Sequence, residues 1–131
     1  MPSMKILLIA GGWSSEREVS LTGARGMQEA LLKRGHAVTF FDLLENFDEL
    51  LETARQHDFA LINLHGSPGE DGLVQAMLEK ADCPYQGSGP SGSFLALNKA
   101  AAKQIFRMAG LPTADWEFLP VRPAEGWEPR L

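Results

Sequence analysis

The sequence predicts an α/β domain: a small, mainly parallel, four-stranded sheet that lies between layers of helices. Two observations predict it. Short apolar runs recur along the chain, and after each run the apolar residues take up the spacing of a helix. Because strands and helices alternate in this way, right-handed crossovers connect parallel strands and place helices on the faces of the sheet. Ligands of such sheets bind beyond the carboxyl ends of the strands.

The first strand is predicted over residues 4–10, an apolar run of the kind that parallel sheets bury on both faces. Gly11-Gly12 ends this strand. A helix is predicted over residues 20–34 from the spacing of its apolar and small side chains. The Ser-x-x-Glu pattern of residues 15–18 is typical of a capping box before a helix, and Gly35 is typical of a helix end.

The next two units repeat this order. A β-rich run over residues 37–42 precedes a shorter helical stretch over 47–56. An apolar strand over residues 59–64 then precedes a helix over 72–81. These two units complete three strands of the expected sheet.

The fourth unit is the least regular. A short strand is predicted over residues 84–86, and a loop over 88–92 follows it. Residues 94–109 have helical spacing, in one piece or in two. Gly110 ends this stretch, with Pro112 two residues later.

Composition narrows the class of protein. The chain has 131 residues, 44% of them apolar, and a formal net charge of −5, which fits one globular domain without a basic face for nucleic acid. The single cysteine, Cys83, excludes an internal disulfide framework and favours a reduced, cytoplasmic compartment. The apolar run Ile6–Ala10 is too short for a signal peptide or a membrane span.

The first loop that could carry chemistry follows the first strand, over residues 11–20. Its glycines permit a tight turn, and the helix start behind them offers free N–H groups to an anion. The spacing Gly-x-Gly-x-x-Gly is missing, which argues against a dinucleotide. Glu16 and Glu18 favour a cationic ligand group instead. The alternative is a strand–helix turn that binds nothing.

The second loop follows the third strand, over residues 64–72. Its glycines and one proline fix an unusual backbone path, with His65 at the strand end and Glu70 and Asp71 before the next helix. The alternative is that one of these carboxylates caps the helix and that His65 packs as a strand terminus. The spacing matches no strong metal-ligand pattern, so we expect no metal site in this chain.

The tail over residues 113–131 differs in character, because it is rich in proline and tryptophan. Alternating side chains near Trp116 predict one short strand over 116–119, with nothing after it to pair with. We therefore expect an α/β domain over residues 1–112, followed by a linker and the first strand of a further domain that lies outside these residues.

Taken together, two segments resemble the amino-terminal domain of the D-alanine–D-alanine ligases, namely Gly11–Leu21 and Leu64–Gly72. Pro84–Lys99 and Ala109–Thr113 look like the same family. The resemblance covers about residues 4–119 in the same order. It implies a Rossmann-like, three-layer fold of the kind called pre-ATP-grasp.

The resemblance also implies a function. The family joins two D-alanines with ATP in the synthesis of peptidoglycan precursors: ATP phosphorylates the carboxylate of the first, and the amine of the second attacks the acyl phosphate. ATP and Mg²⁺ are bound mainly by two further domains, so we expect the chain alone to be inactive. The family implies D-alanine as ligand and a homodimer through this domain, with no nucleic-acid or membrane partner.

Residue roles follow from the resemblance position by position. Glu16 matches the glutamate that holds the ammonium of the first D-alanine, a catalytic role. Val19 matches a residue that lines the same subsite, and Ser20 lies beside it. His65 matches a histidine near the carboxylate of the first substrate, and Glu70 matches a carboxylate of the same loop that orients this histidine.

One residue of the last helix and two departures complete the comparison. Lys99 matches a lysine that reaches ATP phosphates. Trp13 stands where the family more often has a small or polar residue, which would narrow the mouth of the first loop. Asn98 replaces a common acidic residue before the lysine.

Two other readings stay open. The first is a related ATP-grasp ligase that joins a carboxylate and an amine from other amino acids. The second is a non-catalytic dimerisation or regulatory module, in which the strand predicted over Trp116–Leu119 pairs across a symmetry axis.

Overall fold

The computed structural model describes residues 2–119, 121, 125, 126 and 128. The chain forms two compact units, Met1–Leu97 and Asn98–Leu131, and each is described by itself. The domain boundary expected at residue 112 stays a prediction about the complete protein. Within the predicted linker and strand over 113–131, residues 120, 122–124, 127 and 129–131 lie outside the described residues.

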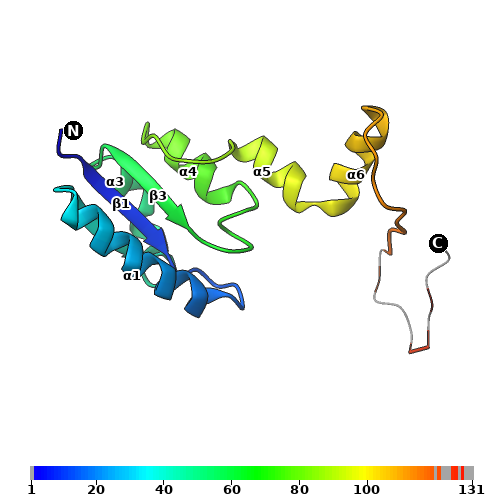
Figure 1. The fold of residues 1–131 in the computed structure, drawn as a ribbon, viewed down its shortest axis with the longest axis horizontal. Coiled ribbons are helices and arrows are strands. Elements are labelled where there is room, and N and C mark those ends of the chain that lie inside the picture. Colours follow the sequence, from blue (N-terminus) through cyan, green and yellow to red (C-terminus); the bar gives the residue numbers. More distant parts are fainter. Residues whose placement is uncertain (1, 120, 122–124, 127, 129–131) are drawn as a thin grey trace. The chain divides into compact units, whose positions relative to one another are not determined.

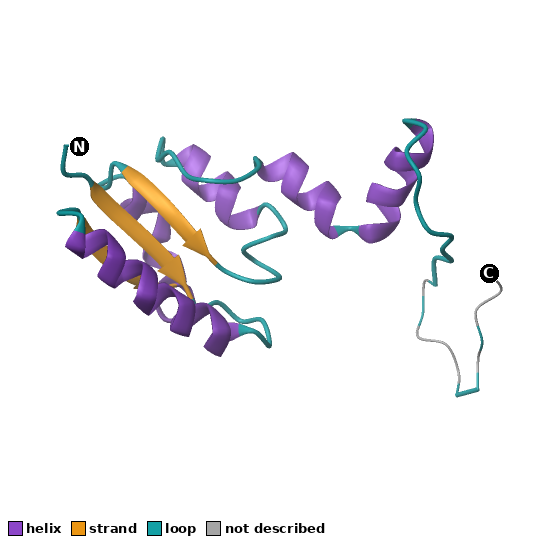
Figure 2. Ribbon diagram, in the orientation of Figure 1, coloured by secondary structure: helices purple, strands orange, loops and turns teal. Residues whose placement is uncertain are grey.

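A parallel sheet forms the centre of the first unit (Figures 1 and 2). It contains three strands: β1 (Lys5–Ala10), β2 (Ala37–Asp42) and β3 (Phe59–Asn63). The order is β2-β1-β3, so β1 lies in the middle. Ala10 is opposite Asp42 on one side and Asn63 on the other. All three carboxyl ends therefore meet at one edge, as the sequence predicted.

The prediction of a fourth strand is wrong. Over residues 84–86 the structure has one isolated parallel bridge, between Ala60 and Tyr85. Beyond it, the side-chain amide of Gln86 replaces a main-chain pairing: its Oε1 accepts from Ile62 N at 2.9 Å and its Nε2 donates to Ile62 O at 2.6 Å. Residues 84–86 thus lie along β3 without forming a strand, because the side chain of Gln86, and not its main chain, bonds to Ile62.

The helices are α1 (Arg17–Lys33), α2 (Leu43–Asn46), α3 (Leu50–Ala54), α4 (Leu73–Lys80), α5 (Pro90–Leu97) and α6 (Lys99–Met108), with a 3₁₀ turn at Phe47–Glu49. The helical stretch predicted over 47–56 is preceded by α2 and begins with the 3₁₀ turn. The stretch predicted over 94–109 is in two pieces, and its first piece starts at Pro90, inside the predicted loop over 88–92.

The predicted capping box before the first helix is also wrong. Helix α1 begins at Arg17, and its N-cap residue Glu16 makes no side-chain capping hydrogen bond. Instead Ser14 Oγ accepts from Glu16 N at 3.2 Å. The two preceding glycines have positive φ angles and turn the chain so sharply that the helix starts before the Ser-x-x-Glu pattern is complete. The predicted helix end is confirmed at Gly35, whose φ is +84°.

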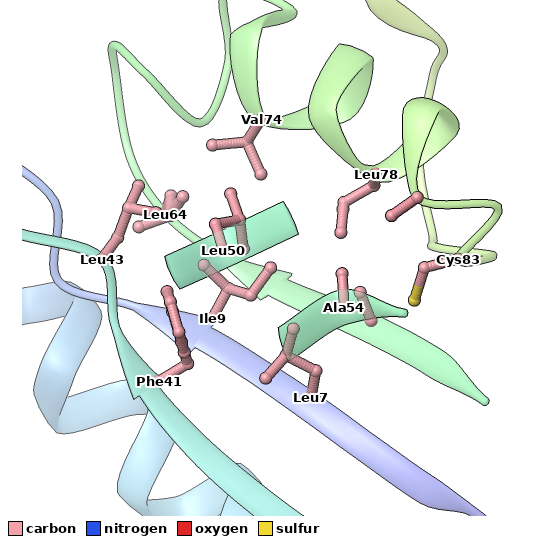
Figure 3. Packing of buried hydrophobic residues seen from close by; sticks show 12 residues of the cluster. Leu7, Ile9, Phe41, Leu43, Leu50, Ala54, Leu64, Val74, Leu78 and Cys83 are labelled. Carbon is pink, nitrogen blue, oxygen red and sulfur yellow. The ribbon is translucent and has the colours of Figure 1, made fainter. Parts of the chain in front are cut away.

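The sheet is buried on both faces, which gives the expected three layers. On one face, Leu7 and Ile9 pack against the side chains of α3 and α4, as Figure 3 shows. On the other face, Leu8 and Ala10 pack against Ala24 of α1. Full burial of each large aliphatic side chain contributes roughly 1.5–3 kcal/mol. The core therefore fixes β1, and β1 fixes where its carboxyl end and the following loop lie.

Cys83 belongs to the same core. Burial raises the pKa of its thiol, so the protonated, unreactive form predominates at neutral pH. Cys83 is therefore a packing residue of the core and not a nucleophile.

The second unit contains α6 and the chain that follows it. Arg107 Nη2 contacts Asp115 Oδ1 at 3.1 Å, and its guanidinium lies 5.9 Å from the ring centre of Trp116. Lys103 Nζ donates to Ala114 O at 2.9 Å. Residues 111–119 have no regular secondary structure. The strand predicted over 116–119 stays a prediction, because strands form by pairing and no described residue pairs with this segment.

None of the helices in the described part of the chain has the length and the apolar character needed to cross a bilayer.

Candidate functional site

The two loops singled out in the sequence lie against each other at the carboxyl edge of the sheet. A Cβ atom placed on Gly12 would lie 3.3 Å from Leu64 Cδ2 and 3.5 Å from Pro68 Cδ. A Cβ atom on Gly66 would lie 3.4 Å from Ser14 Cβ. Both glycines also have positive φ angles, +77° at Gly12 and +66° at Gly66, a backbone conformation that favours glycine. The close approach brings the predicted residues of the first and second loops to one region of the surface.

Ser20 ties the first loop to the sheet. Its side chain is fully buried, and its Oγ accepts from Gly11 N at 2.8 Å and donates to Asn63 O. Asn63 Nδ2 returns a hydrogen bond of 2.7 Å to Ser20 O. These bonds join the ends of β1 and β3 to α1. The hydroxyl of Ser20 is thus occupied inside the protein, so its position suits shaping the loop rather than touching a ligand.

A bidentate ion pair between Arg17 and Asp42 fixes the start of α1. Arg17 Nη1 donates to Asp42 Oδ1 at 2.7 Å, and Arg17 Nη2 donates to Asp42 Oδ2 at 2.6 Å. The same Nη1 lies 3.4 Å from Gly12 O. A side chain on Gly11 would collide with both partners, since its Cβ would lie 2.4 Å from Arg17 Nη1 and 2.6 Å from Asp42 Oδ1. The pair therefore fixes the residue that follows Glu16.

The ion pair also sets the charge of these two groups. Hydrogen bonding to Arg17 lowers the pKa of Asp42 below its ordinary value of 3.8, and the same bond raises the pKa of Arg17. Asp42 stays ionised at neutral pH and neutralises the cation nearest to Glu16. Both oxygens of this carboxylate are thus engaged within the protein.

The second loop is closed by its own polar groups. Gly66 N donates to Glu70 Oε2 at 2.9 Å, and Glu70 N donates to Gly66 O at 2.8 Å. Asp71 Oδ1 accepts from Leu73 N at 3.0 Å, and Ser67 Oγ donates to the other carboxylate oxygen of Asp71. The N-cap position of α4 is Gly72, and Asp71, the residue before it, bonds to the first N–H group of the helix. Glu70 turns back onto its own loop instead.

Glutamates are the exposed charged side chains of the two loops. Glu16 and Glu70 are exposed, His65 is half-buried, and Val19 is 62% exposed beside a shallow hollow lined by Glu18 and its neighbours on α1. With Arg17 neutralised, the surface at the first loop attracts a positively charged group such as an ammonium. Among the residues that the structure describes, no group of three histidines, cysteines or carboxylates could hold a metal ion.

Comparison with known proteins shows what this chain is similar to. No family model matches the chain. Curated D-alanine–D-alanine ligases do: the chain is 76% identical to that of Desulfovibrio desulfuricans and 69% identical to that of Nitratidesulfovibrio vulgaris, each over 98% of its own length. The chain is a relative of the D-alanine–D-alanine ligases and matches their amino-terminal part. It spans 42% of the length of these two relatives.

Solved structures agree with this ligase relationship. The D-alanine–D-alanine ligase of Bacillus anthracis, in complex with ATP, superposes with a TM-score of 0.82 at 37% identity, over 95% of this chain and 43% of that protein. The D-alanyl-alanine synthetase A of Vibrio cholerae superposes with a TM-score of 0.71 at 28% identity, over 91% of this chain and 41% of its own. The predicted α/β fold is confirmed, with three strands instead of four.

The two departures from the ligase pattern have local explanations. Asn98 is the N-cap of α6, and its Oδ1 accepts from Ala101 N at 3.1 Å. Asparagine and aspartate cap helices about equally well, so the replacement leaves the start of the helix intact. Trp13 is 46% exposed and packs edge to face on Phe47, with ring centres 5.4 Å apart. Its ring is held by this contact at the side of the first loop.

Lys99 is the first residue of α6 and lies in the second unit, where its side chain is exposed. An exposed ammonium at this position fits one contact to a phosphate oxygen. It does not make a triphosphate site on its own, because such a site needs several donors and bound Mg²⁺.

Sequence reasoning missed the groups that hold the site. Arg17 and Asp42 are far apart in sequence, and only the parallel pairing of β1 with β2 brings them together. Asn63 ends an apolar strand without any motif around it. A polar residue at the carboxyl end of a buried strand was the available signal for both Asp42 and Asn63.

We predict that Asp42→Asn lowers the free energy of unfolding at pH 7 by about 1–2 kcal/mol, between the values for exposed and buried ion pairs. The stabilisation requires ionised Asp42, whose pKa is lowered in the folded state. It is therefore complete above the ordinary value of 3.8 and is lost as the pH falls through the lower folded-state value. Urea unfolding at a series of pH values measures it.

The matched control is Glu52→Gln, which breaks the exposed Arg55–Glu52 pair and should change stability by no more than about 0.5 kcal/mol. A difference between wild type and Asp42→Asn that stays constant from pH 7 to pH values well below 3.8 would contradict the role of the ion pair.

Proposed function

We propose that this chain is the substrate-binding, amino-terminal domain of an ATP-dependent D-alanine–D-alanine ligase. The observation that carries the proposal is the 76% identity to such a ligase over 98% of the chain. The acidic edge where the two loops meet supports it, because the reaction needs an amino acid held by its ammonium group. The product would serve peptidoglycan synthesis, and a reaction that uses ATP fits a location in the cytoplasm.

Glu16 is proposed to hold the ammonium of the first D-alanine. It precedes Arg17, whose ion pair with Asp42 fixes the first turn of α1, so the position of its backbone is determined. Val19 lies one helical turn further along and would line the same subsite, and Ser20 would shape it from inside. An exposed carboxylate binds an ammonium only weakly in water, and the attraction strengthens when a closed site excludes solvent.

His65 and Glu70 are proposed to act on the carboxylate side of the first substrate. His65 follows the end of β3 by two residues and is half-buried, which limits its movement. Glu70 belongs to the same closed loop through its hydrogen bond with Gly66 N. We propose that Glu70 orients His65, so that the imidazole can face the substrate carboxylate, the group that becomes phosphorylated.

ATP and Mg²⁺ are proposed to be held mainly by parts of the protein outside these residues, with Lys99 contributing one phosphate contact. When bound, ATP supplies the phosphoryl group that activates the carboxylate. The residues of this chain bind and orient the amino acid that receives it. This division accounts for the sparse phosphate-binding chemistry in the described residues.

A homodimer through this domain is part of the proposal. Helix α5 contains no charged residue, and its Phe94 is 58% exposed. Leu95 on the same helix and Leu73 at the start of α4 are exposed too. Such a run of exposed apolar side chains is unusual on a surface that faces only water. A second copy of the chain is the occupant we propose, because homo-oligomers use one patch twice about a symmetry axis.

We predict that the chain binds D-alanine with a dissociation constant of about 1 mM or weaker, because part of the site lies elsewhere. Glu16→Gln should weaken binding by about threefold or more, since it removes the charge opposite the ammonium. Chemical-shift titration by NMR measures both. Glu18→Gln is the matched control and should bind like wild type. Equal affinity of Glu16→Gln and wild type would contradict the role of Glu16.

We also predict that the 131-residue chain releases no ADP from ATP and Mg²⁺ in response to D-alanine. The physical reason is that a single exposed lysine cannot replace the donors and metal ions that phosphoryl transfer requires. A coupled ADP assay with and without D-alanine measures this. ADP release by this chain that depends on D-alanine would overturn the proposed division of labour.

For the dimer, we predict that Phe94→Glu converts the chain to a monomer, because a carboxylate in an apolar interface must be desolvated without a partner. Sedimentation velocity measures the change. The control is Leu32→Glu, on an exposed position of α1. A wild-type chain that sediments as a monomer at the highest soluble concentration would contradict dimerisation through this domain.

A further inference from the structure

Gln75 is a polar residue in an otherwise apolar helix face. It lies on α4 between Val74 and Leu78, which are fully buried, and is itself only 6% exposed. Its Nε2 donates to Gly69 O at 2.6 Å. Its Oε1 is buried and has no hydrogen-bond partner among the described residues. The Nε2 group of the amide thus bonds to the second loop, while its Oε1 atom has no partner among the described residues.

This arrangement costs stability. A buried acceptor without a partner costs about 1–3 kcal/mol. Turning the amide over would not help, because it would place Oε1 against the carbonyl oxygen of Gly69. An aliphatic side chain of similar size would avoid the unsatisfied Oε1 in the core. The donor of Gln75 is therefore the part of the side chain that the loop uses.

The carbonyl that Gln75 holds belongs to the tightest point of the second loop. Gly69 lies so close to β3 that a Cβ atom on it would be 2.1 Å from Leu64 Cβ. Its N–H donates to Gly66 O at 2.9 Å, and Glu70 N donates to the same oxygen. The peptide unit that leads into Glu70 contains the carbonyl of Gly69 and the N–H of Glu70. Gln75 holds the carbonyl and Gly66 O holds the N–H, so this unit has a fixed direction.

Gln75 and Glu70 also face a common space. Both line a cavity of about 360 Å³ together with Gly69, Ser88, Ser93, Ala96 and Leu97. Glu70 borders this open space, and the hydrogen bond from Gly66 N holds its carboxylate on the side of the loop. Loss of the Gln75 anchor would let the peptide unit between Gly69 and Glu70 turn into this space.

We propose that Gln75 is a positioning residue: through the carbonyl of Gly69, it holds the carboxylate of Glu70 in the direction that the substrate site requires. The inference rests on the proposed function in one respect only, that Glu70 serves D-alanine binding. The positioning of Glu70 itself follows from the contacts of Gln75, Gly69 and Gly66.

The test is Gln75→Met, which keeps the length of the side chain and removes both polar atoms. It removes one unsatisfied acceptor, Oε1, and creates another at Gly69 O, so the melting temperature should change little. The direct readout is the amide-proton shift of Gly66 in NMR spectra of the whole chain. The downfield shift caused by the Glu70 carboxylate should be lost, as it is in Glu70→Gln.

Gln86→Met is the matched control. It removes the amide that bonds to Ile62 of β3 and leaves the second loop untouched, so the Gly66 amide should keep its wild-type shift. A loss of the Gly66 shift in this control would mean that general loosening of the fold is responsible. In that case the assignment to Gln75 would be overturned.

Titration with D-alanine separates this inference from the proposed function. We expect Glu70→Gln and Gln75→Met to weaken binding by a similar factor, about threefold or more. If Glu70→Gln binds like wild type, the proposed role of Glu70 fails, while the Gly66 shift still decides the role of Gln75. If Gln75→Met keeps the wild-type Gly66 shift and affinity, the positioning inference is overturned. If Gln75→Met does not fold, Gln75→Leu provides the same two readouts.

Discussion

Burial of β1 on both faces is the constraint on which the rest of the structure depends. The strand has no solvent side, so α1 must cover one face and α3 with α4 the other. Because β1 is also the central strand, its carboxyl end lies between those of β2 and β3. The groups of the two loops in the first unit are placed relative to that one end, through main-chain pairing or through hydrogen bonds that start from the neighbouring strand ends.

Leu64 and Pro68 bury part of the second loop, and polar contacts complete the shape of both loops at this edge. Ser20 with Asn63 fastens the first loop to β3, and Arg17 with Asp42 fastens it to β2. The second loop closes on itself and is anchored to α4 by Gln75. Exposed Glu16 therefore stands on a backbone that buried polar groups hold in place. Preorganisation of this kind lowers the entropy cost of binding a small ligand.

Sequence patterns predicted what depends on local periodicity and on topology. The apolar run of β1 predicted a doubly buried strand, and the parallel order predicted that the loops after β1 and β3 meet. The patterns failed where a hydrogen bond from one particular side chain determines the local structure. Ser14 rather than Ser15 bonds to the start of α1, and Gln86 pairs with β3 in place of a fourth strand. Arg17 with Asp42, and Gln75 with Gly69, involve specific atoms in three dimensions that no periodicity encodes.

The amide of Gln86 has a consequence for how this protein meets other chains. The Gln86 amide bonds to both the N–H and the C=O of Ile62, so these groups cannot pair with a strand from another chain. The N–H of Ala60 is also engaged, because it donates to Pro84 O. An exposed sheet edge invites growth by strand addition, which leads to swapped or aggregated forms. Here the side chain of Gln86 blocks strand addition at the β3 edge of the sheet. The sheet can thus stay small without a fourth strand to terminate it.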